Sequence, residues 1–247
     1  TKTTNKDFDI SIDEEKLNQI NSNILQIEDE YYTVIRPKST NTEFLRMTKN
    51  LLNTGVEFVE YRILDLDPFS SIGISRDTLI FLKMFMFYCL WEDDECMEPS
   101  ELGKIDINED LISRFGRKKN LNLHYKSNST TKELWAKEIL NKMLKLANNI
   151  EENERIIEII NNAISAIDDP KLTLSGKLCS MQKDLKVSFL DIFMDYAISY
   201  KQEFTRRPIS SNQHYRTFED EAKRSNIKFS ELSETNPTSF HEYLSKY

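Results

Sequence analysis

The chain has 247 residues, of which 39% are hydrophobic and 30% charged, and its formal net charge is −8. An acidic chain of this kind has no general attraction for nucleic acids or anionic membrane surfaces, so the composition argues against both as partners. Its five glycines and six prolines are too few for a turn-rich β-sandwich, and no apolar run reaches the eighteen or so residues that a membrane-spanning helix needs.

The first quarter of the chain predicts two helices and a connector. Residues 11–36 open with a capping box and carry apolar side chains at three- and four-residue spacing, which predicts an amphipathic helix. A second helix is expected over residues 42–55. Residues 56–64 alternate enough to suggest a strand, but an isolated strand would have no partner. We therefore expect a helix or an extended connector there.

The most apolar and aromatic stretch lies at residues 78–99. Its first part is apolar nearly all round, which is typical of a buried helix, and it is too short to cross a bilayer. The stretch ends in a group of acids. Because Asp94 and Glu98 are four residues apart, they share one helix face, and Asp93 lies beside them. We expect an apolar, ring-lined wall with carboxylates at its rim.

The second half of the chain is predicted to be helical after an interruption. Residues 100–131 are the least helical part and are expected to form a long polar loop. Periodic apolar side chains and proline breaks then predict helices over residues 132–146, 156–167, 178–204 and 212–224. No repeat or domain boundary is visible. We therefore expect an all-α, single helical domain over residues 1–247, packed around a central apolar cavity.

The cysteines bear on the compartment. Cys89, Cys96 and Cys179 are odd in number and lack the spacing of metal ligands, so reduced thiols are expected. Together with the lack of a visible signal peptide, this predicts a cytoplasmic protein. A monomer or a homodimer is compatible with the sequence.

The acidic end of the aromatic helix resembles a known motif. Residues 93–98 read DDECME, which has the DDxxxE form of the first metal-binding motif of class I terpene synthases. The flanking segments 64–71 and 200–226 are similar to that family as well. The resemblance implies the all-α class I terpenoid synthase fold. It also implies a carbon–oxygen lyase that ionises a linear prenyl diphosphate, with farnesyl diphosphate as the expected substrate, to a terpene.

The resemblance assigns roles to particular residues. Asp93 and Asp94 would be catalytic and would hold Mg2+, or Mn2+, with support from Glu98. A departing diphosphate needs cations to neutralise its charge, and a carbocation is stabilised by aromatic faces. Arg224 would contact the diphosphate, with Arg216 as the alternative. Tyr88 and Trp91, which face the same side of the helix as Asp94, would also bind the substrate.

A second metal motif of the terpene synthase family is harder to place. Asn226, Ser230 and Glu234 have its spacing, but Ile227 stands where the family has Asp. Alternatively, the motif lies beyond Tyr247, and the chain is truncated at its C-terminal end.

Two other functions compete with this one. The acidic group could be the edge of a non-catalytic helical interaction protein. A prenyl chain-elongating transferase is the nearer alternative, although it would need a second Asp-rich motif, which the sequence lacks.

Overall fold

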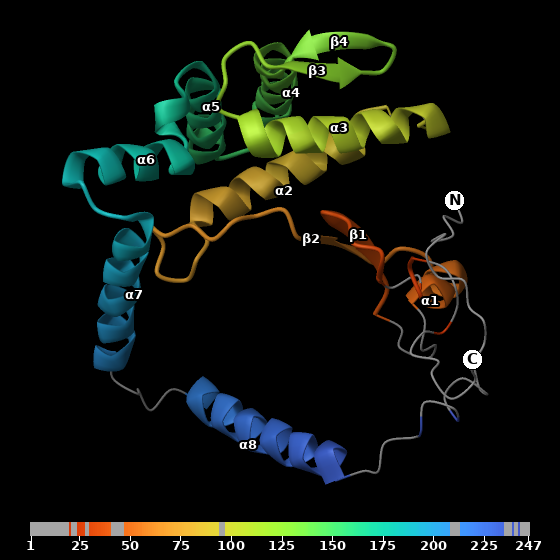
Figure 1. Ribbon diagram of the computed structural model, residues 1–247, viewed down its shortest axis with the longest axis vertical. Coiled ribbons are helices and arrows are strands. Elements are labelled where there is room, and N and C mark those ends of the chain that lie inside the picture. Colours follow the sequence, from red (N-terminus) through yellow and green to blue (C-terminus); the bar gives the residue numbers. More distant parts are fainter. Residues whose placement is uncertain are drawn as a thin grey trace. The chain divides into compact units, whose positions relative to one another are not determined.

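A computed structural model of the chain describes residues 20, 24–27, 30–40, 47–93, 97–207, 213–234, 239 and 242. The chain divides into two compact units, Thr1–Asp65 with Pro208–Tyr247, and Leu66–Arg207. Figure 1 shows their elements. The expectation of one domain over residues 1–247 is not tested by this division and stays a prediction.

The first unit contains a two-stranded antiparallel sheet (Figure 1). Strand β1 (Ile35–Lys38) pairs with β2 (Phe58–Tyr61) in a register that places Ile35 opposite Tyr61. The expected connector over residues 56–64 is therefore wrong, since part of it is a strand with a partner. The partner strand, β1, overlaps the end of the helix expected over residues 11–36. Most of that expected helix lies outside the described residues.

The carboxylate of Glu57 links the segment after β1 to the segment before β2. Helix α1 (Met47–Thr54) lies between them in sequence and is followed by Gly55, whose φ of 78° is left-handed. Beyond it, Glu57 Oε2 accepts hydrogen bonds from Ser39 Oγ (2.9 Å) and Thr40 Oγ1 (2.8 Å). These bonds tie the exit of β1 to the entry of β2. The other described helix of this unit, α8 (Gln213–Glu234), exposes the side chains described between residues 215 and 232.

The second unit is mostly helical. Its elements are α2 (Arg76–Trp91), α3 (Pro99–Phe115), β3 (Asn122–Tyr125), β4 (Asn128–Thr131), α4 (Lys132–Ala147), α5 (Glu154–Asp168), a short 3-10 turn (Pro170–Leu172), α6 (Leu174–Leu185) and α7 (Phe189–Arg206). Several helices begin where a hydroxyl side chain accepts a backbone N–H, as expected of N-caps. The capping residues are Ser75, Thr131, Thr173 and Ser188. Among the described residues, no helix has the length and apolarity to cross a membrane.

The long polar loop expected over residues 100–131 is replaced by a helix and a hairpin. Helix α3 begins with Pro99, and the N–H of Glu98 donates to Glu101 Oε2 over 3.0 Å. The hairpin β3–β4 follows. The side chain of Asn108 in α3 holds it: Asn108 Nδ2 donates to the carbonyl of His124 and Asn108 Oδ1 accepts the N–H of His124, both over 2.8 Å. The prediction was wrong here because the sequence of α3 has no strong apolar face, which would have indicated a helix. In agreement with this, none of its residues is fully buried.

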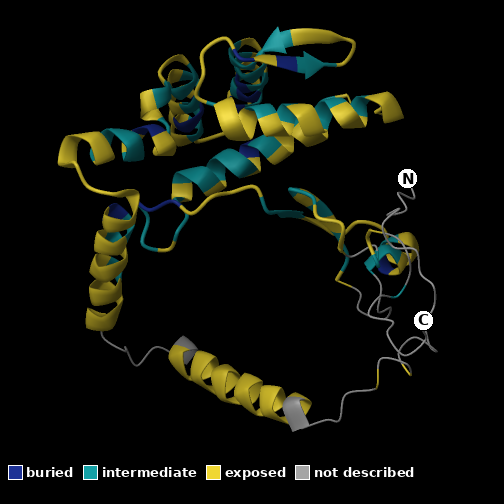
Figure 2. Ribbon diagram, viewed as in Figure 1, coloured by how far each residue is buried: buried dark blue, intermediate teal, exposed yellow. Residues whose placement is uncertain are grey.

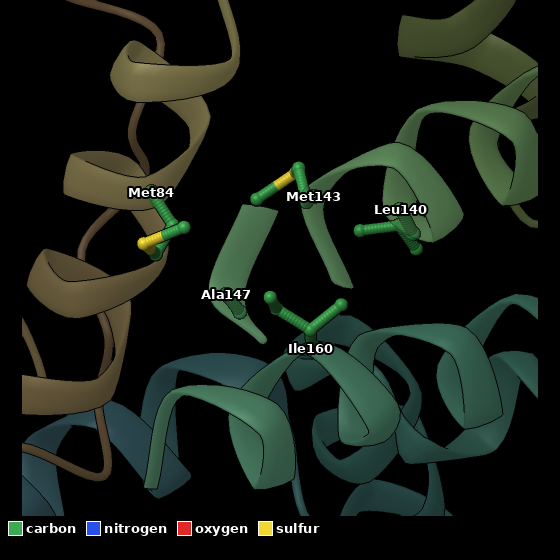
Figure 3. Close-up of a cluster of buried hydrophobic side chains, with 5 residues drawn as sticks. All are labelled: Met84, Leu140, Met143, Ala147 and Ile160. Atoms are coloured by element: carbon green, nitrogen blue, oxygen red, sulfur yellow. The ribbon is translucent and has the colours of Figure 1, made fainter. Parts of the chain in front are cut away.

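The core of the second unit joins α2, α4 and α5. Figure 3 shows Met84 of α2 directed toward side chains of the other two helices. The cluster comprises Met84, Leu140, Met143, Ala147 and Ile160. The space against α2 is filled by these side chains, so the expectation that residues 78–91 line a central apolar cavity is not met on this face. Figure 2 shows that α2 also carries exposed residues, and both sheets make the all-α prediction wrong.

Two leucines of α4 provide a test of this core. Leu140 is 5% exposed within the cluster, whereas Leu134 on the same helix is 66% exposed. We expect Leu140→Ala to lower the free energy of unfolding by about 2–5 kcal/mol, because it leaves a cavity. The control, Leu134→Ala, should change it by less than about 0.5 kcal/mol. Urea unfolding followed by circular dichroism measures both, and equal losses would show that the core is misplaced.

Candidate functional site

Asp93 and Glu98, two of the three acids expected to bind metal, do not share one helix. Helix α2 ends at Trp91, and the N–H of Glu92 closes its last turn on the carbonyl of Tyr88. Asp93 follows and is exposed, while Asp94 lies outside the described residues. Glu98 has an extended backbone, with ψ of 144°, because the residue before a proline avoids the helical region. Pro99 therefore opens α3 and does not close α2.

A metal centre made of Asp93, Asp94 and Glu98 thus stays untested, since one of its three members is not described. Within the parts of the chain that are described, no three His, Cys, Asp or Glu side chains lie close enough to hold a metal ion.

The expected substrate-binding residues lie on two helices, Tyr88 and Trp91 on α2 and Arg224 on α8. Tyr88 is half-buried, and burial raises the pKa of its hydroxyl, with the Glu92 carboxylate adding to the shift. Trp91 is 78% exposed at the end of α2. Arg224 lies on the exposed side of α8, where its guanidinium pairs with Glu221 at 2.5 Å.

The residues considered for a second metal motif are bonded within α8. Asn226 Nδ2 donates to the carbonyl of Ala222 over 2.9 Å, and Ser230 Oγ donates to the carbonyl of Asn226 over 3.1 Å. Such bonds to the preceding turn are usual for polar side chains in helices. Nothing described of these two side chains suggests a metal site.

Charged side chains instead gather on the β1–β2 sheet. In the antiparallel register Arg36 lies opposite Glu60, and Arg62 continues the ladder by donating its N–H to the carbonyl of Val34 over 2.8 Å. Since alternate residues of a strand point to the same side, Arg36, Lys38, Glu60 and Arg62 share one face of the sheet. We call these four residues the charged face.

Glu60 forms ion pairs with two of the other residues of the charged face, Arg62 and Lys38. Its carboxylate receives Arg62 in a bidentate pair, with Nε–Oε1 and Nη2–Oε2 both at 3.0 Å. Lys38 Nζ approaches Glu60 Oε2 at 3.4 Å. The Arg62 guanidinium also lies 5.5 Å from the centroid of the Tyr32 ring, within cation–π range.

This pairing fixes the ionisation of the group. The hydrogen bond from Arg62 lowers the pKa of the Glu60 carboxyl, against the effect of partial burial, and the charges of Arg62 and Lys38 lower it further. The same hydrogen bond raises the pKa of Arg62. Three cationic side chains and one carboxylate give the face a net charge of +2 at neutral pH. A cationic face of this kind suits a phosphate or a carboxylate ligand.

Sequence reasoning missed the charged face, although a signal was present. Charged residues occur at every second position in both strands, at 36 and 38 and again at 60 and 62. Because a helix is expected over residues 11–36, the sequence alone does not place these two charge patterns side by side.

Comparisons with known proteins show that the chain is similar to glutamate–cysteine ligases. A family model described as glutamate-cysteine ligase matches residues 2–112, which include the charged face. The chain is 29% identical to the glutamate–cysteine ligase of Azotobacter vinelandii and 30% identical to that of Shewanella halifaxensis, in each case over 232 residues. These alignments cover 93% of this chain but 44% of each relative. The chain therefore spans less than half the length of the relatives it matches.

Solved structures agree in fold. A glutamate–cysteine ligase from Francisella tularensis, solved in complex with AMP, superposes with a TM-score of 0.81 at 27% identity, covering 93% of this chain and 45% of that one. A bifunctional glutathione synthetase from Pasteurella multocida matches with a TM-score of 0.55 at 19% identity, over 71% of this chain and 22% of that one, which shows a shared fold alone.

These findings overturn the terpene synthase prediction. The fold is mostly helical with small sheets and superposes on part of the Francisella tularensis ligase; it is not the terpenoid synthase fold. The lyase activity, the prenyl diphosphate substrate and the ionisation chemistry are therefore wrong. The DDxxxE sequence was a short match to a motif, in a place where the chain changes helix. Over almost its whole length, this chain is similar to part of the glutamate–cysteine ligases.

Proposed function

We propose that this chain carries part of a glutamate–cysteine ligase, which joins glutamate to cysteine through the γ-carboxyl group with the use of ATP. The observation that carries the proposal is the superposition of 93% of the chain on the Francisella tularensis ligase. The sequence similarity to glutamate–cysteine ligases of several bacteria supports it as well. Since ATP is a cytosolic metabolite, a cytoplasmic location is part of the proposal.

The chemistry of the reaction indicates what the site must provide. A carboxylate is a poor electrophile, so an amide bond forms only after the carboxyl oxygen has been activated, and transfer of a phosphoryl group from ATP supplies this activation. The polyphosphate brings several negative charges next to a carboxylate. Cationic side chains in fixed positions offset that repulsion and stabilise the charge that develops during transfer.

The charged face fits this need. Arg62 is held in a fixed orientation by the bidentate bond to Glu60 and by the Tyr32 ring, so little side-chain freedom is lost when it meets an anion. Glu60 acts in this arrangement as the group that orients Arg62 and Lys38. The AMP in the Francisella tularensis crystal supports a nucleotide site in that enzyme.

Mg2+ is the metal proposed to accompany ATP. The described residues fit nucleotide phosphates better than a bare metal ion, because the one carboxylate of the charged face already binds two cations. Mg2+ commonly reaches such sites on the phosphates themselves. When bound, it would neutralise phosphate charge, while Arg36, Lys38 and Arg62 bind and orient the anion.

Removal of the Arg62 guanidinium tests the nucleotide site. We expect Arg62→Ala to weaken binding of Mg-ATP about 10- to 100-fold, because a hydrogen bond to a charged group contributes about 1.5–3 kcal/mol. Arg224→Ala is a matched control, since Arg224 is also paired with a glutamate but lies on α8. Isothermal titration calorimetry measures both affinities, and a parallel assay detects γ-glutamylcysteine by mass spectrometry. A chain that neither binds ATP nor forms this product contradicts the proposal.

The titration of Glu60 tests the geometry of the charged face. Because Arg62 lowers the pKa of Glu60, the carboxyl should titrate below the ordinary range, and Arg62→Gln should raise its pKa toward that range. The pair contributes stability above the pKa of the unfolded chain and loses it as the pH falls through the lower folded value. Carbon-13 NMR of the glutamate carboxyls measures this shift. An unchanged pKa in Arg62→Gln would show that the pair does not form in solution.

A further inference from the structure

One aromatic ring lies beside the charged face and is exposed to solvent. The guanidinium of Arg62 lies over the ring of Tyr32, 5.5 Å from its centroid. Tyr32 is nevertheless 63% exposed. A ring has two faces, and the guanidinium covers one of them, so the other is accessible to a planar ligand.

Hydrogen bonds on both sides of Tyr32 hold the segment that carries it. Before it, the N–H of Gln26 donates to Glu30 Oε2 over 2.6 Å. After it, Thr33 Oγ1 donates to the carbonyl of Ile35, the first residue of β1, also over 2.6 Å. The ring is therefore tied to the sheet, and a ring in a fixed place loses little conformational freedom when a ligand stacks on it.

The ring and the charged face offer two kinds of contact in a fixed order. At one end of the sheet, beside the Tyr32 ring, the N–H of Arg62 bonds to the carbonyl of Val34. Four residues further along the chain, Lys38 lies opposite Phe58. An aromatic surface is thus followed by cationic side chains. A nucleotide has the same order of groups, a planar base first and then the phosphates.

Stacking adds affinity without any need to recognise a particular base. Every base has a π-face, so an aromatic side chain stacks on all of them, and this contact is separate from the contacts with the phosphates. The Arg62 guanidinium, on the other face of the ring, is bonded to Glu60 and is directed toward the charged face. One side chain thus touches both the ring and the group of cations.

We propose that Tyr32 is the base-stacking residue of a nucleotide site whose phosphates lie on the charged face. The base lies on the exposed face of the Tyr32 ring, while Arg62, on the opposite face, orients the phosphates. The inference rests on the proposed function for the phosphate part of the site. Tripolyphosphate, which has the phosphates of ATP but no base, separates the two.

Titration calorimetry with the full chain compares Mg-ATP with the magnesium complex of tripolyphosphate. The ratio of the two affinities is the measured quantity, because any loosening of Arg62 acts on both ligands. In the parent chain ATP should bind more tightly, and Tyr32→Ala should lower the ratio about 5- to 100-fold, as expected for the loss of one stacked base. Tyr32→Phe should restore the ratio, because it keeps the ring.

Tyr31 provides the matched control. It is the neighbour of Tyr32 in sequence and is 60% exposed, so Tyr31→Ala removes a similar ring and should leave the ratio unchanged. NMR gives a second measurement. The ring protons of Tyr32 should shift upfield when ATP is added, because they come to lie over the base, and should stay in place with tripolyphosphate.

Four results would overturn the inference. If ATP and tripolyphosphate bind equally well, or if Tyr32→Ala leaves the ratio unchanged, the base does not stack on Tyr32, although the proposed function stands. An equal fall in Tyr31→Ala would show that the loss is not specific to the Tyr32 ring. If neither ligand binds, the inference and the proposed function fail together.

Discussion

The antiparallel pairing of β1 with β2 decides where the charged residues of the candidate site point. Its register places Arg36 opposite Glu60 and puts Lys38 and Arg62 on the same face. A shift of the register by one residue would send one strand's charges to the other face. The hydrogen bonds that Glu57 accepts from Ser39 and Thr40 hold the end of β1 to the start of β2 and so oppose such a shift. The chemistry proposed for the face therefore depends on a structural carboxylate that takes no part in it.

The pairs on the charged face contribute little to stability by themselves. The side chains of Glu60, Arg62 and Lys38 are about a quarter to a third exposed, and ion pairs near the surface gain little because water and salt screen them. The stability of the described helical unit comes from elsewhere, chiefly from the contacts of Met84, Met143 and Ile160 between α2, α4 and α5. This separation is what a binding surface requires, since its charges can meet a ligand without loss of the fold.

Some elements could be predicted from the sequence, and others could not. The helices expected over residues 132–146 and 156–167 correspond to α4 (Lys132–Ala147) and α5 (Glu154–Asp168), because their apolar side chains recur with helical spacing and face a core. Strands β1 and β2 were missed because their partners are some twenty residues apart, and a local pattern does not show what a strand pairs with. The charged face was missed with them. The prediction that Asp94 and Glu98 share one helix face assumed a continuous helix through residues 93–98. Local spacing does not show that α2 ends at Trp91 and that α3 begins at Pro99.

The acidic end of α2 illustrates the same limit. Acids at a helix C-terminus oppose the helix dipole, which favours cations there. In the structure a cation from another helix offsets this repulsion, because Lys142 of α4 forms an ion pair with Glu92. The hydrogen bond within this pair raises the pKa of Lys142. Glu92 lies about two helical turns beyond Met84, so the pair fixes the end of α2 beyond the core. A residue that breaks a local rule can therefore have a structural partner fifty positions away, and only the packing of α4 on α2 shows which explanation holds.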